Sequence, residues 1–342
     1  MSDTNPVTVW IGIDISKETF DAVIAQPNGK RPHKPFANTP AGFSKLLRWV
    51  ESLGLVEPRF SVRFCMESTG AYGMALAEHL VEGGHMVSIE NPARIKHFGS
   101  ALNKGAQNKT DKADARVIAE YAQAFNPAPW LRSQPEVKLL VALLRRLDSL
   151  EAHLQEENNR LGQPATAVPA EVKRSLEETI HFLQTEIERL KEQIERHIDQ
   201  HPGLKADQTL LVSIPGISET TARRILAEMP DVSLFTSAKQ AAAYAGLAPK
   251  ECRSGTSVHK KTRISKSGNA RLRSALYFPA ITATRYNQPV KELYDRLIER
   301  GNSKMAALVA AMRKLLMIAY GVLKSRTTFS PDFVPVAGKQ KA

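Results

Sequence analysis

Two apolar, strand-like runs that carry a carboxylate at their ends constrain the fold of this chain more than any other feature. The run VTVWIGIDI reaches Asp14 one residue before its end, and the run FSVRFCME ends at Glu67. A buried carboxylate is costly, because desolvation disfavours its charged form unless a cation compensates. The two runs therefore indicate an α/β unit that gathers acids around a cation.

A second acidic pair, Asp111 and Asp114, opens the helix-like stretch TDKADARVIAEYA. Four carboxylates favour a hard divalent ion, Mg²⁺ with Mn²⁺ as a substitute, and such an ion suits phosphoryl transfer. An ordinary structural explanation stands beside this one. Asp14 could cap a turn, Glu67 could cap a helix, and the other two acids are favoured at a helix N-terminus.

The composition predicts an intracellular protein with a polyanionic partner. The chain has 342 residues and a formal net charge of +12, which favours nucleic acid as the partner. Its two cysteines form no metal-ligand pattern and fit a reducing cytoplasm. The longest apolar stretch, residues 305–323, contains Arg313 and Lys314, so we expect a packing helix and no membrane association.

Changes of pattern along the chain predict three domains and a tail. Residues 1–128 read as the α/β unit, with strands over 7–16, 19–25, 60–67 and 86–90 and helices over 40–53 and 69–81. Residues 129–204 hold two leucine seams typical of a coiled coil, which fold back on each other or pair between subunits. Residues 205–328 read as a mostly α-helical domain, and residues 329–342 as a flexible tail.

The C-terminal domain carries two candidate nucleic-acid elements. The stretch LVSIPGISETTARRILAEM resembles a helix-hairpin-helix, whose turn offers backbone N–H groups to a phosphate. Residues 250–273 form a basic, hydroxyl-rich segment, which we interpret as a flexible loop that binds phosphates without reading bases. Its cations are Lys250, Arg253, Lys260, Lys261, Arg263, Lys266, Arg271 and Arg273.

Several motifs in register resemble the insertion-sequence 110 family of transposases over nearly the whole chain. GIDISKETFDAVI, MESTGAY and NKTDKADARVIAEYA resemble its RuvC-like nuclease domain, which has an RNase H fold. IPGI, FTSAKQAAAYAGLAP, RSGTS and ISKSGNARLRSAL resemble its transposase domain. The resemblance makes Asp14, Glu67, Asp111 and Asp114 the catalytic metal ligands and Ser254 the catalytic nucleophile.

The resemblance also implies a reaction and partners. Family members join DNA through a phosphoserine intermediate, are guided by a structured RNA encoded by the element, and act as homo-oligomers (dimers or tetramers) that bring one subunit's metal site to another's serine. Thr256, Ser257, Ser265 and Ser267 are rival hydroxyls that the sequence alone does not rank below Ser254. We expect such an enzyme to work in the cytoplasm, on the bacterial nucleoid.

Alternative functions remain open at this point. A RuvC-like Holliday-junction nuclease would use the acids with metal-activated water, and a site-specific DNA invertase would be another member of the same family. A sugar-kinase or actin-like ATPase would use Gly12 to Lys17 as a phosphate loop, although Ile15 stands where a glycine is normally found. A nucleic-acid binder without catalytic activity explains the charge but not the clustered acids.

Overall fold

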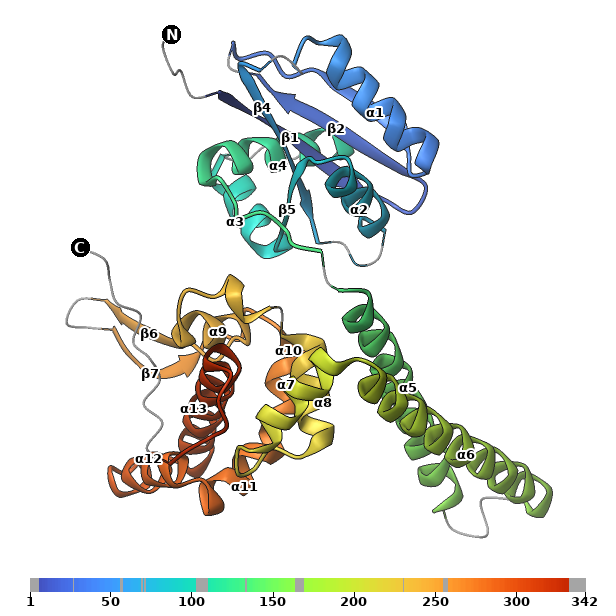
Figure 1. The fold of residues 1–342 in the computed structure, drawn as a ribbon, viewed down its shortest axis with the longest axis vertical. Coiled ribbons are helices and arrows are strands. Elements are labelled where there is room, and N and C mark those ends of the chain that lie inside the picture. Colours follow the sequence, from blue (N-terminus) through green and yellow to red (C-terminus); the bar gives the residue numbers. More distant parts are fainter. Residues whose placement is uncertain are drawn as a thin grey trace. The chain divides into compact units, whose positions relative to one another are not determined.

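The computed structural model divides the chain into two compact units, Met1–Arg132 and Ser133–Ala342 (Figure 1). It describes residues 6–26, 28–55, 58–68, 70, 72–102, 110–132, 134–163, 169–229, 231–254 and 258–331. Of residues 251–254 and 258–263 it describes the backbone alone. One hydrophobic core runs from the first helix of the second unit to its last. The predicted division of that unit at residue 204 and the predicted tail therefore stay predictions.

The first unit is built on a five-stranded sheet with the order β3-β2-β1-β4-β5. β1 lies at its centre, antiparallel to β2 and parallel to β4. The strands are β1 (Val7–Ile15), β2 (Thr19–Ala25), β3 (His33–Ala37), β4 (Phe60–Glu67) and β5 (Met86–Glu90). Successive side chains of a strand point to opposite faces of a sheet, so β1 contributes side chains to two separate cores, one on each face.

Helices cover both faces of this sheet. On one face, α1 (Pro40–Ser52) and α2 (Met74–Glu82) pack on the odd-numbered residues of β1, such as Ile11 and Ile13. On the other, α3 (Pro92–Leu102) and α4 (Asp111–Phe125) pack around Trp10 and Cys65. The Thr110 hydroxyl accepts a hydrogen bond from the N–H of Ala113 at 3.2 Å, so Thr110 is the N-cap of α4.

The first unit differs from the sequence-based prediction at its short elements. β3 and α3 were not predicted, and α2 begins at Met74 where we expected a helix from residue 69. Gly70, with a φ of +78°, and Gly73 precede the helix, and glycine disfavours helical backbone. Residues 69 and 71 lie outside the described part of the chain.

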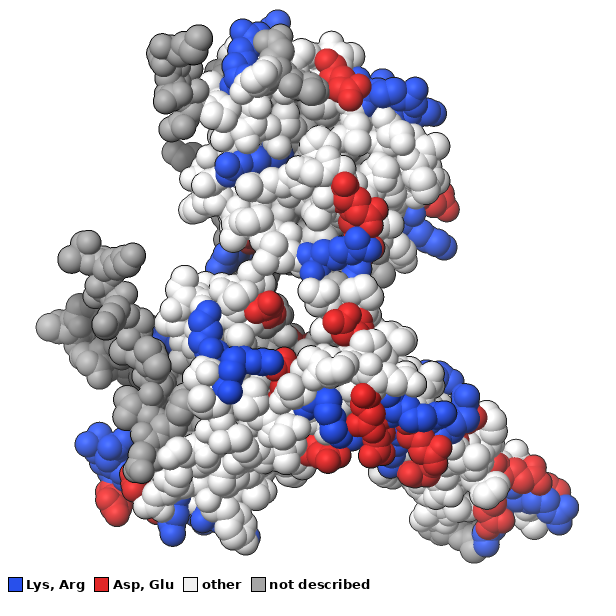
Figure 2. Space-filling view, viewed as in Figure 1, with Lys and Arg blue, Asp and Glu red and all other residues white. Residues whose placement is uncertain are grey.

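The two leucine seams of the second unit pack against each other within one chain. They lie on α5 (Pro135–Leu161) and α6 (Ala170–Gln200), which run side by side in Figure 1. Leu140, Leu147, Leu183 and Ile187 are buried in the shared core. A second subunit is therefore not needed to cover the seams. Figure 2 shows acidic and basic side chains mixed along this helical pair, as is typical of a solvated surface.

The remaining helices of the second unit share one hydrophobic core with α13 (Lys304–Ser325). They are α7 (Pro202–Val212), α8 (Glu219–Glu228), α9 (Ala238–Tyr244), α10 (Ala270–Ala275), α11 (Tyr277–Tyr286) and α12 (Gln288–Glu299), with a 3₁₀ turn at Val232–Leu234. By length and composition α13 is apolar enough to cross a membrane, which corrects our argument from Arg313 and Lys314. Most of it is buried in the unit, so it packs as the expected core helix.

The basic segment is a hairpin, and our interpretation of it as a flexible loop was wrong. β6 (Pro249–Ser254) pairs antiparallel with β7 (Val258–Ile264), and α10 follows. The run VHKKTRI has β-branched residues at Val258, Thr262 and Ile264, two or four residues apart, which favours one face of a strand. The density of charge concealed this pattern.

Candidate active site

The backbone register brings Asp14 and Glu67 to the same edge of the sheet. β1 and β4 run parallel, with Ile13 opposite Met66, so the next residue of each strand is the acid. Both side chains are partly buried. Neighbouring strands lie about 4.8 Å apart, which places the two carboxylates beside each other at the carboxyl ends of the strands.

Helix α4 brings the second acidic pair to this edge because its backbone lies directly on β1. A Cβ atom on Gly12 would stand 2.2 Å from the nitrogen of Ala119 and 2.3 Å from the carbonyl oxygen of Ala115. Asp14 lies two residues beyond Gly12 and points to the same face. One helical turn before Ala115 comes the first turn of α4, which carries Asp111 and Asp114.

The pKa of the Asp14 carboxyl is shifted by burial and by the acids around it. Burial, as the largest cause, and the negative charges of Asp114, Asp111 and Glu67 together raise its pKa to about 6. A hydrogen bond from the Ile15 N–H acts in the opposite direction but is the smaller effect. The four predicted acids therefore lie within electrostatic reach of one another, at the N-terminus of α4.

The donor set fits a hard divalent cation. It consists of carboxylate oxygens alone, and their mutual repulsion is relieved by a positive charge placed among them. Among the described residues, no group of three or more His, Cys, Asp or Glu side chains is close enough to hold a metal ion. The carboxylates are thus neighbours rather than a closed ligand shell.

Two further acids occupy the same edge and were not singled out from the sequence. Asp21 lies opposite Asp14 on β2, and its Oδ1 atom is 2.5 Å from Nε2 of His33. Glu90 lies opposite Glu67 on β5, accepts a hydrogen bond from the N–H of Asn91 at 3.3 Å, and has Arg94 at 3.6 Å. Glu90 ends a strand just as Glu67 does, so the same sequence pattern could have identified it as a candidate site residue.

Ser254 is the last residue of β6, opposite Val258 on β7. Its side chain lies outside the described part of the chain, as do residues Thr256 and Ser257 and the side chains of Arg253, Lys260, Lys261 and Arg263. Ser265 and Ser267 follow β7, in the turn before α10. The backbone thus puts Ser254 at the tip of a basic hairpin in the second unit.

The described cations of the basic segment differ in their surroundings. Lys250 and Lys266 are exposed. The guanidinium of Arg273 donates to the carbonyl oxygens of Ala245 at 2.9 Å and Lys266 at 3.4 Å, so it ties the end of α9 to the turn that follows β7. Arg271 forms an ion pair with Asp148 at 3.4 Å. A role for these four cations in nucleic-acid binding stays a prediction.

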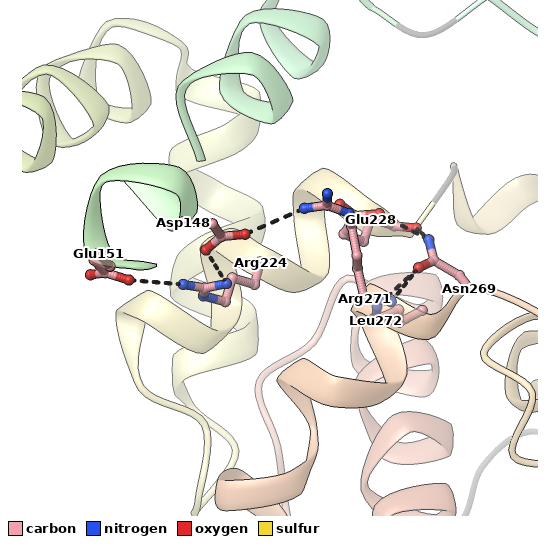
Figure 3. Close-up of polar contacts among 7 residues, drawn as sticks. All are labelled: Asp148, Glu151, Arg224, Glu228, Asn269, Arg271 and Leu272. Carbon is pink, nitrogen blue, oxygen red and sulfur yellow. Dashed lines mark hydrogen bonds and ion pairs between the residues drawn. The ribbon is translucent and has the colours of Figure 1, made fainter. Parts of the chain in front are cut away.

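A polar cluster ties the helix that follows the hairpin to α8 and α5 (Figure 3). The Asn269 side chain caps α10 by accepting from the N–H groups of Arg271 and Leu272, and it donates to the Glu228 carboxylate at 3.0 Å. Asp148 of α5 lies 2.7 Å from Arg224 of α8 and also pairs with Arg271. The base of the hairpin is therefore fixed to two other helices of its unit.

The stretch that resembles a helix-hairpin-helix forms α7, a turn and α8, with Ser218 as the N-cap of α8. Its turn packs against α11, because a Cβ on Gly216 would lie 2.9 Å from the carbonyl oxygen of Pro279. The N–H of Ile217 donates to the carbonyl oxygen of Ile214 at 3.0 Å. These contacts use the turn for packing, and its contact with a phosphate stays a prediction.

Comparison with known proteins gives two matches to family models. One, described as "Transposase IS116/IS110/IS902 family", matches residues 208–295. The other, DEDD_Tnp_IS110, described as "Transposase", matches residues 11–165. The first range contains Ser254, and the second contains all four acids.

Curated relatives match over most of the chain. The "Pilin gene-inverting protein" of Moraxella lacunata is 36% identical over 322 residues, which are 94% of this chain and 97% of that protein. The "Transposase for insertion sequence element IS1111A" of Coxiella burnetii is 28% identical over 65% of this chain and 68% of its own length. The "Transposase for insertion sequence element IS1328" of Yersinia enterocolitica is 26% identical over 95% and 99%, respectively.

Proposed function

The chain belongs to the IS116/IS110/IS902 family of transposases, and we propose that it cuts and rejoins DNA with an acidic metal site and a serine nucleophile. As a member of this family it is a DNA-processing enzyme. The observation that carries the proposal is the convergence of Asp14 with Glu67, Asp111 and Asp114. Burial, together with the charges of these three acids, raises the pKa of Asp14 to about 6.

We assign the first unit to the RuvC-like, RNase H type of fold. Its mixed sheet has an antiparallel β1–β2–β3 part and a parallel β1–β4–β5 part, with helices on both faces. The acids stand on the central strand, on its parallel neighbour and on the helix that crosses them. This arrangement supports the DEDD assignment of the four residues as metal ligands.

A DEDD transposase domain indicates a divalent metal ion, and we propose Mg²⁺, with Mn²⁺ as a substitute, held by these four residues. When bound, the ion supplies positive charge to the attacking and leaving oxygens of a phosphoryl transfer. The carboxylates orient the ion, and the partial positive charge at the N-terminus of α4 favours their ionised form.

In the proposed reaction, Ser254 attacks the scissile phosphate of DNA. The Ser254 oxygen forms a new bond to phosphorus and loses its proton, while the bond from phosphorus to a sugar oxygen breaks and that oxygen leaves as a hydroxyl. A phosphoserine diester remains, so a hydroxyl of another strand can reverse the step and rejoin DNA without ATP. The cations of the basic hairpin offset the charge that develops on the phosphate.

We also propose a structured guide RNA from the element and a homo-oligomer as partners, with the enzyme acting on the nucleoid in the cytoplasm. The resemblance to the family supports both partners, and the net charge of +12 suits binding of two kinds of nucleic acid. In the oligomer, the acidic set of one subunit would act with Ser254 of another.

DNA inversion is the second candidate reaction, because the relative from Moraxella lacunata is named a pilin gene-inverting protein. The chemistry at the strands is the same for inversion and transposition. Two plasmids distinguish the two reactions. The first carries the element ends in inverted orientation, and the second carries a separate target. An inverted segment in the first supports inversion, and insertion into the second supports transposition.

A nicked DNA substrate tests the serine step against metal-activated water. We expect wild-type protein with Mg²⁺ to form a covalent adduct on the peptide that contains Ser254, and Asp14→Ala or excess EDTA to abolish it. Ser254→Ala should bind DNA but form no adduct, whereas Ser257→Ala is the matched control and keeps substantial activity. Cleavage by Ser254→Ala at the wild-type rate would instead support a RuvC-like junction nuclease.

A further inference from the structure

A basic groove lies between β3 and α1 on the first unit. Its volume is about 610 Å³, within the range of ligand-binding clefts. β3 is the edge strand of the sheet, and α1 packs beside it. The groove is lined by Lys34, Pro35, Phe36, Ala37, Lys45, Arg48, Trp49 and Ser52.

The charge of the groove is of one sign. Lys34, Lys45 and Arg48 line it, and no acid is among the lining residues. Lys34 Nζ lies 5.8 Å from the ring centre of Phe36, and Arg48 Nε donates to the carbonyl oxygen of Ser44 at 3.4 Å. Within the described part of the chain none of the three cations forms an ion pair. Unpaired cations facing one cleft favour an anionic ligand.

An aromatic side chain forms part of the floor. Trp49 is partly exposed and lies 5.7 Å from Phe36, centre to centre, at an interplanar angle of 54°. Phe36 is itself buried and stacks on Phe20, so it fixes the indole from below. A fixed, partly exposed indole beside cations is the combination on which an unpaired nucleic-acid base stacks.

Protection of the sheet edge explains only part of this arrangement. A lysine and a proline on an edge strand prevent strand addition, which accounts for Lys34 and Pro35. Lys45, Arg48 and Trp49 belong to α1, where spacings of three and four residues place them on one face. That face turns toward β3, so the helix contributes cations that the edge itself does not need.

The groove is close to the acidic site along the sheet. Pro35 lies opposite Asp21, which lies opposite Asp14. Two strand spacings amount to roughly 10 Å between the backbones of Pro35 and Asp14. Phe36 packs on the face that α1 covers, whereas Asp14 points to the face that α4 covers. A strand of DNA at the acidic site would therefore reach the groove around the free edge of the sheet at β3.

We propose that this groove holds a single-stranded segment of the substrate DNA, with phosphates on Lys34, Lys45 and Arg48 and one base stacked on Trp49. The inference depends on the proposed function only in that the ligand is DNA. Single-stranded DNA is favoured over duplex because Trp49 can stack only on an unpaired base. The groove thereby retains a strand that is opened beside the acidic site.

The test measures binding of oligothymidylate to the full-length protein in EDTA, where cleavage plays no part. The Lys45→Gln/Arg48→Gln variant should bind about tenfold more weakly and reduce the slope of log affinity against log salt by about 1.4, for two lost contacts. Oligothymidylate should quench tryptophan fluorescence, and Trp49→Phe should lose most of that quenching. Trp10 is buried and should contribute little.

The matched control is Lys173→Gln/Lys191→Gln, which removes two exposed lysines of α6 that pair with neighbouring glutamates. It should leave affinity within about twofold of wild type. Thermal unfolding should be the same for all variants. Unchanged affinity in Lys45→Gln/Arg48→Gln, full quenching in Trp49→Phe, or an equal loss for duplex DNA would each overturn the proposal. If Lys45→Gln/Arg48→Gln bound oligouridylate more weakly than wild type but oligothymidylate equally well, the occupant would be RNA, which would also overturn the proposal.

Discussion

At the scale of single residues, Asp14 is held in a position that disfavours its charged form. Burial and three neighbouring carboxylates raise its pKa to about 6, from the usual 3.8. The folded chain therefore binds more protons at Asp14 than the unfolded chain between these two values. The free energy of unfolding consequently falls as pH rises from about 4 to 6, and the penalty persists above pH 6.

We expect Asp14→Asn to be more stable than wild type at pH 8 in EDTA, by roughly 1–2 kcal/mol after allowance for solvent screening. The difference should shrink to a small remainder toward pH 4, where Asp14 is protonated in the folded chain and, with a pKa of 3.8, about half ionised in the unfolded chain. Urea unfolding of both proteins from pH 4 to 8 measures it. A difference independent of pH would contradict the electrostatic origin of the shift.

The same residue shows how far the sequence predicts the site. Asp14, Glu67, Asp111 and Asp114 were found because each ends a strand-like run or opens a helix, and these signals are local. Asp21 was missed because it lies within a strand pattern, and only the antiparallel pairing of β1 with β2 puts it opposite Asp14. Register between strands depends on long-range pairing, which a single segment does not encode.

At the scale of elements, the contact of α4 with β1 assembles the candidate site. The helix backbone reaches the strand only because Gly12 has no side chain. An apolar strand with a glycine in the middle was read as a strand, correctly, but the reason for the glycine became visible only with the helix in place. Gly12 therefore positions the acids of α4 without contacting a substrate.

Gly12→Ala should move α4 off the strand, because both close contacts are to backbone atoms that cannot rotate away. We expect a loss of about 1–3 kcal/mol in stability from overpacking, together with loss of DNA cleavage. Urea unfolding and a cleavage assay measure the two effects. Gly203→Ala, in the first turn of α7 with open space around it, should be neutral in both assays. Normal cleavage by Gly12→Ala would exclude this positioning role.

Elements with a strong pattern of their own were predicted, and those shaped by their neighbours were not. The four predicted strands (β1, β2, β4 and β5), α1 and the leucine seams carry clear patterns. β3 has five residues with a proline among them and is a strand because β2 offers it a partner. The partner of each seam was left open between two choices, and the fold decides it by packing α5 on α6.

At the scale of the whole molecule, the proposed chemistry uses residues of two separate units. The four acids belong to Met1–Arg132, and Ser254 belongs to Ser133–Ala342. Each unit has its own core, so a substitution at Asp14 leaves the second unit folded and one at Ser254 leaves the first unit folded. A subunit that lacks Asp14 therefore still has a functional Ser254, and a subunit that lacks Ser254 still has the four acids.

If the acids of one subunit act with Ser254 of another, a mixture of Asp14→Ala and Ser254→Ala should recover activity that neither variant has alone. In a mixed dimer one composite site holds both substitutions, and the other holds none. With random mixing, half of the dimers are mixed, so we expect about a quarter of the wild-type number of intact sites. Co-refolding or co-expression followed by the adduct assay measures this recovery.

Asp14→Ala mixed with Asp114→Ala is the control and should stay inactive, because both substitutions fall in the same unit and every composite site lacks an acid. Failure of the first mixture, with mixed oligomers present by mass, would show that the acids and the serine act within one chain.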